Sequence, residues 1–275
     1  MRSCYLFYLF IIVAIGFTPL HAAFDYPAYS ARSAAMANSY VASTFACDGF
    51  MMNPALLSNA TSFYGALNYA QLFALADLRY ANGMAGMPVK SFALGLGIED
   101  FGNSLYRETK LALSASKLFY NNLLSIGISF QFYNISVQNY GNSSTIGLNL
   151  GIRYQILPAL HVAGAIENFN QPRLNGYGEE IPQRIQVGFQ YKPLDQLAAH
   201  FKIQKDSWFS PEALLGIEYQ IFNNLELYSG YSTLGTIPSF GVLLNIKKIE
   251  ISYAMQYHFD LGPTHFAGIA FNPKS

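Results

Sequence analysis

Charged residues are scarce in this chain. Aspartate, glutamate, lysine and arginine form only 12% of its 275 residues, and 16 positive residues balance 16 negative ones. Soluble domains average about 25% charged residues, so the composition argues against a secreted soluble protein. Since no basic excess is present, no nucleic acid partner is expected. The composition favours a protein that exposes much of its surface to a membrane.

Long apolar runs are also scarce. One run, from Tyr5 to Phe17, follows Arg2 and precedes the small-residue pattern Leu20-His21-Ala22. This arrangement predicts a cleaved Sec signal peptide over residues 1–22. The run is too short for a comfortable membrane span. The exported chain is therefore expected to begin near Ala23 or Phe24.

Cysteine is nearly absent. Cys4 lies upstream of the predicted cleavage point, so a lipoprotein is not expected, and Cys47 remains alone in the exported chain. This excludes an intramolecular disulfide framework even in an oxidising compartment. Backbone pairing and burial must hold the fold. Trp208 is the only tryptophan, but phenylalanine and tyrosine raise the aromatic content to 16%, which suits strands and membrane interfaces.

From about Thr61 onward, apolar residues recur at every second position. The stretch 124–132, LSIGISFQF, is a clear example. Successive side chains of a strand point to opposite faces, so each stretch has one apolar face and one face of glycine, serine or polar residues. About fourteen strands are predicted, at residues 62–70, 77–85, 89–98, 107–119, 123–133, 144–156, 160–168, 184–191, 198–204, 213–221, 225–231, 239–246, 249–259 and 264–271.

Two all-β architectures produce this alternation: a soluble sandwich with apolar faces inward, and a membrane barrel with its apolar face outward. Most predicted strands run for about 9 to 13 residues, which is long for a globular strand and sufficient for a tilted membrane crossing. Tight links, such as Gly86-Met87-Pro88, follow the even strands, whereas longer loops at 99–106, 134–143, 169–183 and 205–212 follow odd ones. This favours a transmembrane antiparallel β-barrel in an outer membrane, with both termini of the barrel on the periplasmic side.

The polar face of the predicted strands carries charges of both signs. Charges of this kind are intolerable toward lipid and natural toward a wet or plugged lumen. The alternative is the solvated outer face of a soluble sandwich. The charged residues assigned to the lumen are Arg79, Arg153, Glu167, Arg184, Lys202, Glu218, Glu226 and Glu250.

The segment from Ser30 to Leu57 lacks the period of two. It is rich in small residues, and residues 33–46 are expected to form a short helix. Asn53-Pro54, followed by Ala55 and Leu56, predicts a turn or helix boundary because the residue before proline avoids helical angles. We interpret residues 23–60 as a plug, or hatch, that can enter the barrel of residues 61–275 and pivot near Asn53-Pro54. An ordered tail or an extra strand is the alternative.

No catalytic or metal-ligating pattern stands out, so neither an enzyme nor a cofactor is expected. The histidines have no carboxylate or serine at a telling spacing, and a hydrolase pair of Ser252 and His258 is the one arrangement that can be imagined. The loop at residues 168–182 is more promising because long external loops of barrels often carry recognition. Its candidate recognition residues are Arg173, Glu179 and Glu180, with a merely solvated loop as the alternative.

Four short pieces of the chain form a pattern: ARSAAMANSYVA at residues 31–42, Asn53-Pro54-Ala55-Leu56-Leu57, Glu167-Asn168-Phe169 with Ile181-Pro182, and LGPTHF at residues 261–266. With these pieces, the mature chain resembles the PorV/PorQ group within the FadL-like outer-membrane barrels. Two departures stand out. Ala37-Asn38 replaces the two glycines that the family usually has, and four residues follow the aromatic Phe271.

The resemblance implies a fourteen-stranded barrel in the outer membrane of a Gram-negative bacterium, surrounded by lipid. It also implies one of two roles. The first is an accessory component of type IX protein secretion and cell-surface attachment, with secretion proteins or their cargo as partners. The second is a FadL-like channel for small hydrophobic molecules. The mixed charge of the predicted lumen favours the first role slightly.

Overall fold

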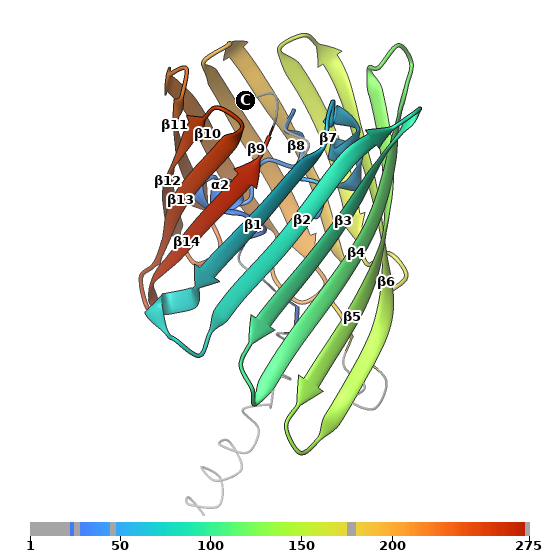
Figure 1. Ribbon diagram of the computed structural model, residues 1–275, viewed down its shortest axis with the longest axis vertical. Helices are drawn as coiled ribbons and strands as arrows, with labels where there is room; N and C mark the ends of the chain where they lie inside the picture. The colour runs from blue at the N-terminus through green and yellow to red at the C-terminus, as the bar shows by residue number, and fades with distance from the viewer. Residues whose placement is uncertain (1–22, 25–27, 45–47, 175–179, 273–275) are drawn as a thin grey trace, which may run out of the picture.

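The computed structural model describes residues 23–24, 28–44, 48–174 and 180–272 (Figure 1). The predicted signal peptide, Cys47 and Glu179 lie outside these ranges. The described residues form fourteen strands that close into a single antiparallel barrel, as the alternation predicts. The strands are β1 (Tyr64–Gln71), β2 (Arg79–Val89), β3 (Phe92–Gly102), β4 (Tyr106–Phe119), β5 (Leu124–Val137), β6 (Gly141–Leu157), β7 (Leu160–Glu167), β8 (Arg184–Leu194), β9 (Leu197–Asp206), β10 (Glu212–Phe222), β11 (Leu225–Ser232), β12 (Ile237–Ile246), β13 (Ile249–His258) and β14 (Gly262–Phe271).

Closure comes from the pairing of the first and last strands. Gly65 of β1 faces Phe271 of β14 and the register continues without a break to Gln71 and His265. A closed sheet leaves no strand edge unpaired, which lipid requires because it offers no hydrogen-bond partner. The large apolar residues of the outer face are exposed, as expected for a wall covered by acyl chains. Among the described residues, no helix is long and apolar enough to cross a membrane.

The two ends of the barrel differ in their connections. We call the end that carries both barrel termini and the connections after even strands the turn end, and the opposite end the loop end. Turns of two residues, such as Asn223-Asn224 and Lys247-Lys248, prevail at the turn end. The loop end carries the short 3-10 helix η2 (Leu72–Ala74) and the longest connection, which joins β7 to β8. Outer-membrane barrels place their short turns in the periplasm.

Several predicted connections are wrong in detail. Gly86-Met87-Pro88 belongs to β2, and the turn lies at Lys90-Ser91 instead. The loops predicted at 99–106 and 134–143 shrink to three residues each because β3, β5 and β6 continue beyond their apolar stretches. Polar residues there still pair with their neighbours, as Asn134 does with Ser144, since a strand end in water needs no apolar face.

The lumen face carries the predicted charges with one exception. Arg153, Glu167 and Glu218 are buried inside the barrel, and Arg184 shares the inward face of β8 with buried Gln186. Arg79 was assigned to this face but points outward. It is the first residue of β2, where the rim meets water, and its Nε donates a hydrogen bond to the carbonyl of Gly102 at 3.0 Å.

The N-terminal segment lies inside the barrel (Figure 1). We call its described residues, 23–24, 28–44 and 48–59, the plug. It contains the helix α2 (Ala31–Ala35), which packs against β11 to β14, and the 3-10 helix η1 (Pro54–Asn59), which packs against β3 to β6. The predicted short helix is present, but its bounds are not 33–46: α2 has five residues, and the left-handed Ala37 and Asn38 follow it.

The plug runs from one end of the lumen to the other. At the loop end, the backbone N–H of Phe24 donates to Glu108 Oε2 at 2.7 Å, and its ring meets that of Tyr133 edge-on at 4.8 Å. At the turn end, the hydroxyls of Ser58 and Ser125 are in contact before the chain enters β1. The plug therefore occupies the path along the barrel axis.

Candidate functional site

The helix η1 begins where the Asn53-Pro54 pair predicts a boundary. The Asn53 side chain caps it by accepting a hydrogen bond from the Ala55 N–H at 3.0 Å, and Pro54 occupies its first turn. The Asn53 amide also donates to the carbonyl of Val41 at 2.9 Å, which joins η1 to the preceding plug segment. Asn53, Pro54, Ala55 and Leu56 are all buried. The four residues thus form a packed joint; whether it moves stays a prediction.

Ionic contacts hold α2 to the wall. Arg32 lies 3.6 Å from the Glu250 carboxylate of β13 and 4.0 Å from Asp48 of the plug, and its Nε donates to the Tyr228 hydroxyl at 3.1 Å. Burial alone would lower the pKa of Arg32, but Tyr228, Asp48 and Glu250 outweigh burial and raise it. The guanidinium therefore stays charged and links the plug to two strands.

Asp48 also organises the plug internally. The Ser30 hydroxyl donates to the Asp48 carboxylate at 3.0 Å and accepts from the Ser33 N–H, which caps α2. The Tyr40 hydroxyl donates to the Asp48 carbonyl at 3.0 Å. Burial raises the pKa of Tyr40, so this hydroxyl stays protonated as a donor. Asp48 thus holds both Ser30 and Tyr40 in place within the plug.

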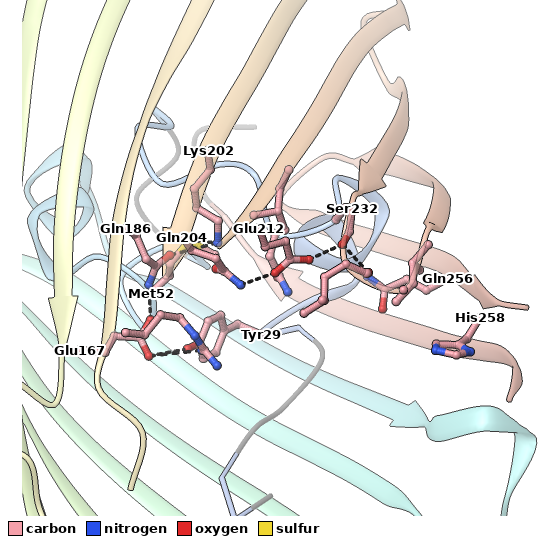
Figure 2. A pocket seen from close by; sticks show the side chains of 17 residues that line it. Tyr29, Met52, Glu167, Gln186, Lys202, Gln204, Glu212, Ser232, Gln256 and His258 are labelled. Atoms are coloured by element: carbon pink, nitrogen blue, oxygen red, sulfur yellow. Dashed lines mark hydrogen bonds and ion pairs between the residues drawn. The ribbon is translucent and has the colours of Figure 1, made fainter. Parts of the chain in front are cut away.

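A pocket of about 290 Å³ lies between the plug and the barrel wall, toward the loop end (Figure 2). Its floor is made by the plug and its sides by the wall of β7 to β13. The plug contributes Tyr29, Ala37, Asn38 and Met52; the wall contributes Glu167, Arg184, Gln186, Lys202, Gln204, Glu212, Leu214, Ser232, Leu234, Gly235, Ile237, Gln256 and His258.

The polar residues of the pocket form a chain of contacts. Glu167 accepts a hydrogen bond from the Tyr29 hydroxyl at 3.3 Å and lies 3.6 Å from Arg184, so it connects the plug with the wall. Lys202 donates to Gln186 Oε1 at 3.0 Å, and Gln186 in turn donates to Glu167. A change at the pocket wall can therefore reach the plug through Glu167.

Two further predicted lumen residues, Arg153 and Glu218, lie toward the turn end. Arg153 donates to Asn59 at the end of η1, and Glu218 lies 3.7 Å from His200. The structure therefore brings Glu167 and Arg184 together but separates them from Arg153 and Glu218. His200 and Gln190 are buried on the same wall, and among the described residues their side-chain polar atoms find no hydrogen-bond partner.

The predicted recognition loop is partly described. Arg173 and Glu180 form an exposed ion pair and an isolated β-bridge. These contacts join the two sides of the loop between β7 and β8. Glu179 lies outside the described residues. Leu174 and Ile181 are buried beside this pair, against Phe24 and Tyr133.

The imagined hydrolase pair is wrong. Ser252 and His258 lie on the same strand, β13, six residues apart, which separates their Cα atoms by about 20 Å. The His258 Nδ1 instead accepts the backbone N–H groups of Asp260 and Leu261 at 3.2 Å. Within the described ranges, no group of three or more His, Cys, Asp or Glu residues could hold a metal ion.

Sequence reasoning missed the plug side of the pocket. Tyr29, Asn38 and Met52 carry no periodic signal, because the plug follows the shape of the lumen and has no repeating structure of its own. Gln186 and Glu212 could have been found, since each shares the inward face of its strand with a buried neighbour: Gly188 beside Gln186, and Leu214 beside Glu212.

No family model matches the sequence. No curated protein matches it either. Solved structures do match. The CymD monoaromatic hydrocarbon channel aligns with a TM-score of 0.70 at 16% identity, over 90% of this chain and 98% of its own. The Ralstonia pickettii toluene transporter TbuX gives 0.67 at 14% identity over 90% and 99%, and a Pseudomonas aeruginosa FadL homologue gives 0.67 at 10% over 92% and 100%. The chain therefore has the fold of the FadL-like outer-membrane barrels.

Proposed function

We propose that this protein is a FadL-like outer-membrane channel for small hydrophobic molecules, in which the plug controls passage. The observation that carries the proposal is the pocket at the loop end, whose floor is the plug itself. Its volume of about 290 Å³ lies just below the range of about 300–1,000 Å³ that is usual for small-molecule sites. The size favours a molecule of one ring or a short chain.

The structural neighbours support the same class of function. CymD is a monoaromatic hydrocarbon channel and TbuX is a toluene transporter. The apolar part of the pocket, which includes Met52, Leu214 and Ile237, could contact such a molecule. Passage would then require Tyr29, Asn38 and Met52 to leave the floor, since these plug residues close the pocket toward the turn end.

A pair of neighbouring substitutions tests the proposal. Leu214 points into the pocket, whereas Leu215, the next residue of β10, points toward lipid and is 49% exposed. Leu214→Trp should fill the pocket and reduce the uptake of labelled toluene by cells that carry the protein in an intact outer membrane. Leu215→Trp should leave uptake unchanged. Equal uptake by both variants and the original chain would overturn the proposal.

The accessory role in type IX secretion is the second candidate. It is favoured by the loop between β7 and β8, which exposes the ion pair of Arg173 and Glu180 at the loop end. Affinity isolation from the native outer membrane tests it. This role is supported if secretion components or cargo are recovered with the original chain and with the exposed control Arg107→Glu, but not with Arg173→Glu. Toluene uptake without such partners would exclude it.

A further inference from the structure

The outer wall of the barrel contains an apolar groove of about 680 Å³. Two neighbouring rows of outward-facing residues flank it, each row running across the strands through paired positions. One row is Ile249, Phe271, Gly65, Ala85 and Leu96; the other is Ile269, Leu67, Gly83, Ile98 and Leu111. The groove therefore crosses β13, β14, β1, β2, β3 and β4, which are neighbouring strands of the barrel (Figure 1).

Small residues create the hollow. Gly65, Gly83 and Ala85 face outward on β1 and β2, between large apolar residues that are about half exposed, such as Leu96 and Ile269. A Cβ added at Gly65 would meet its nearest atom, in the Phe63 ring, only at 3.6 Å. The groove thus has free space at Gly65, whereas a Cβ at Gly83 would lie 3.2 Å from the end of the Leu67 side chain. Its lining is almost wholly apolar.

The groove starts at the turn end beside two exposed lysines. Its first residue, Ile249, directly follows the turn Lys247-Lys248, and the Asn272 N–H donates to the Lys248 carbonyl at 2.8 Å. From there the groove moves away from the rim: Ile249 begins β13, whereas Leu111 lies in the middle of β4. Across four strand spacings, from Ile249 to Leu96, it is about 19 Å long. Half of the hydrocarbon core of a bilayer is about 15 Å.

We propose that this groove binds one phospholipid with an anionic headgroup from the leaflet at the turn end. An acyl chain lies across Gly65, Gly83 and Ala85, and the headgroup phosphate contacts Lys247 and Lys248. The apolar lining accounts for the chain, because this face is in the membrane. The two lysines account for the charge, since each lysine near an anionic membrane surface strengthens attraction about fivefold. The proposal does not depend on what passes through the lumen.

Native mass spectrometry of the detergent-purified protein tests the proposal. Phosphatidylglycerol and phosphatidylethanolamine with the same acyl chains are the two probes, and the first should bind more tightly with a ratio of one lipid per barrel. The double variant Lys247→Gln/Lys248→Gln should weaken phosphatidylglycerol binding roughly 5- to 25-fold. It should weaken phosphatidylethanolamine binding less, because the ammonium group of that lipid cancels the charge of its phosphate. The control Lys192→Gln removes a lysine near the same rim, on β8, far from the groove.

A second pair of variants tests the groove itself. Gly65→Leu should fill the hollow and weaken both lipids, whereas Gly164→Leu, at an outward glycine of β7, should weaken neither. Heat-modifiable gel migration shows that each variant is folded. The proposal is overturned if the two lipids bind equally, if Lys192→Gln matches the double variant, or if Gly65→Leu binds like the original chain.

Discussion

The backbone of Pro54 in the plug lies directly against Gly127 of β5. A Cβ at position 127 would stand 2.3 Å from the Pro54 carbonyl carbon, closer than any Cβ approaches backbone. Gly151 of β6 plays the same part for Asn53, whose side-chain oxygen would lie 2.0 Å from an added Cβ. The wall therefore has room for η1 because these two positions lack side chains.

Gly127→Ala should displace η1 from the wall. Overpacking of this kind costs about 1–3 kcal/mol of stability, and a loosened plug should raise the ion conductance of the barrel in a planar bilayer. Gly164→Ala is the control, since a Cβ there would meet its nearest atom at 3.6 Å. Unchanged conductance and unchanged urea unfolding in Gly127→Ala would show that η1 is seated elsewhere.

Arg32→Ala should destabilise the protein by about 3–5 kcal/mol. The substitution leaves the buried Asp48 and Glu250 carboxylates without their cation, and breaking a buried pair in this way is costly. The midpoint of urea unfolding, followed by the fluorescence of Trp208, measures the change. Arg107→Ala is the control. It removes a pair with Asp100 in which the arginine is 57% exposed, and should cost about 0–1 kcal/mol.

Ala37→Gly should stabilise the plug by about 0.5–1 kcal/mol. Ala37 has a φ of 50°, a left-handed conformation that is unfavourable for any residue with a Cβ. Ala34→Gly, inside α2, is the opposite case and should cost about 1 kcal/mol because helical angles suit alanine. The order of the three unfolding midpoints is the test; a lower midpoint for Ala37→Gly than for the original chain would contradict it.

The same position shows what the sequence could and could not reveal about the plug. Neither Ala37 nor Asn38 is a glycine, yet both residues adopt the left-handed conformation that glycine would favour. The bounds of α2 were not predictable, because its end is set by this left-handed pair and by contacts with β11 to β14.

The barrel was predictable because one simple rule acts on every strand. Lipid on one side and the lumen on the other impose a period of two, so the number of strands and the inward face of Arg153, Glu167, Arg184 and Glu218 could be derived from alternation. The rule fails at the rim, where water replaces lipid. Arg79 could point outward there, and β5 and β6 could extend through polar residues that were expected to form a loop.

The position of the pivot can be tested by fixing the plug at either side of it. Ser58 and Ser125 touch through their hydroxyls, so Ser58→Cys/Ser125→Cys should form a disulfide between η1 and β5, in a background with Cys47→Ala. If the plug pivots near Asn53-Pro54, η1 stays in place during passage. Oxidation of this variant should therefore leave toluene uptake unchanged.

The matched crosslink lies before the pivot. A Cβ at Gly216 would lie 3.0 Å from the Met36 Cβ and 2.2 Å from the Ser39 hydroxyl, so Met36→Cys/Gly216→Cys is combined with Ser39→Ala. A slight outward shift of either strand or plug reaches the Cβ separation of about 3.5–4.5 Å that disulfides need. Oxidation should then abolish uptake, and a reductant should restore it. Equal loss of uptake in both crosslinked variants would contradict a pivot near Asn53-Pro54. The pivot would then lie beyond Ser58, because η1 would have to leave the wall together with the rest of the plug.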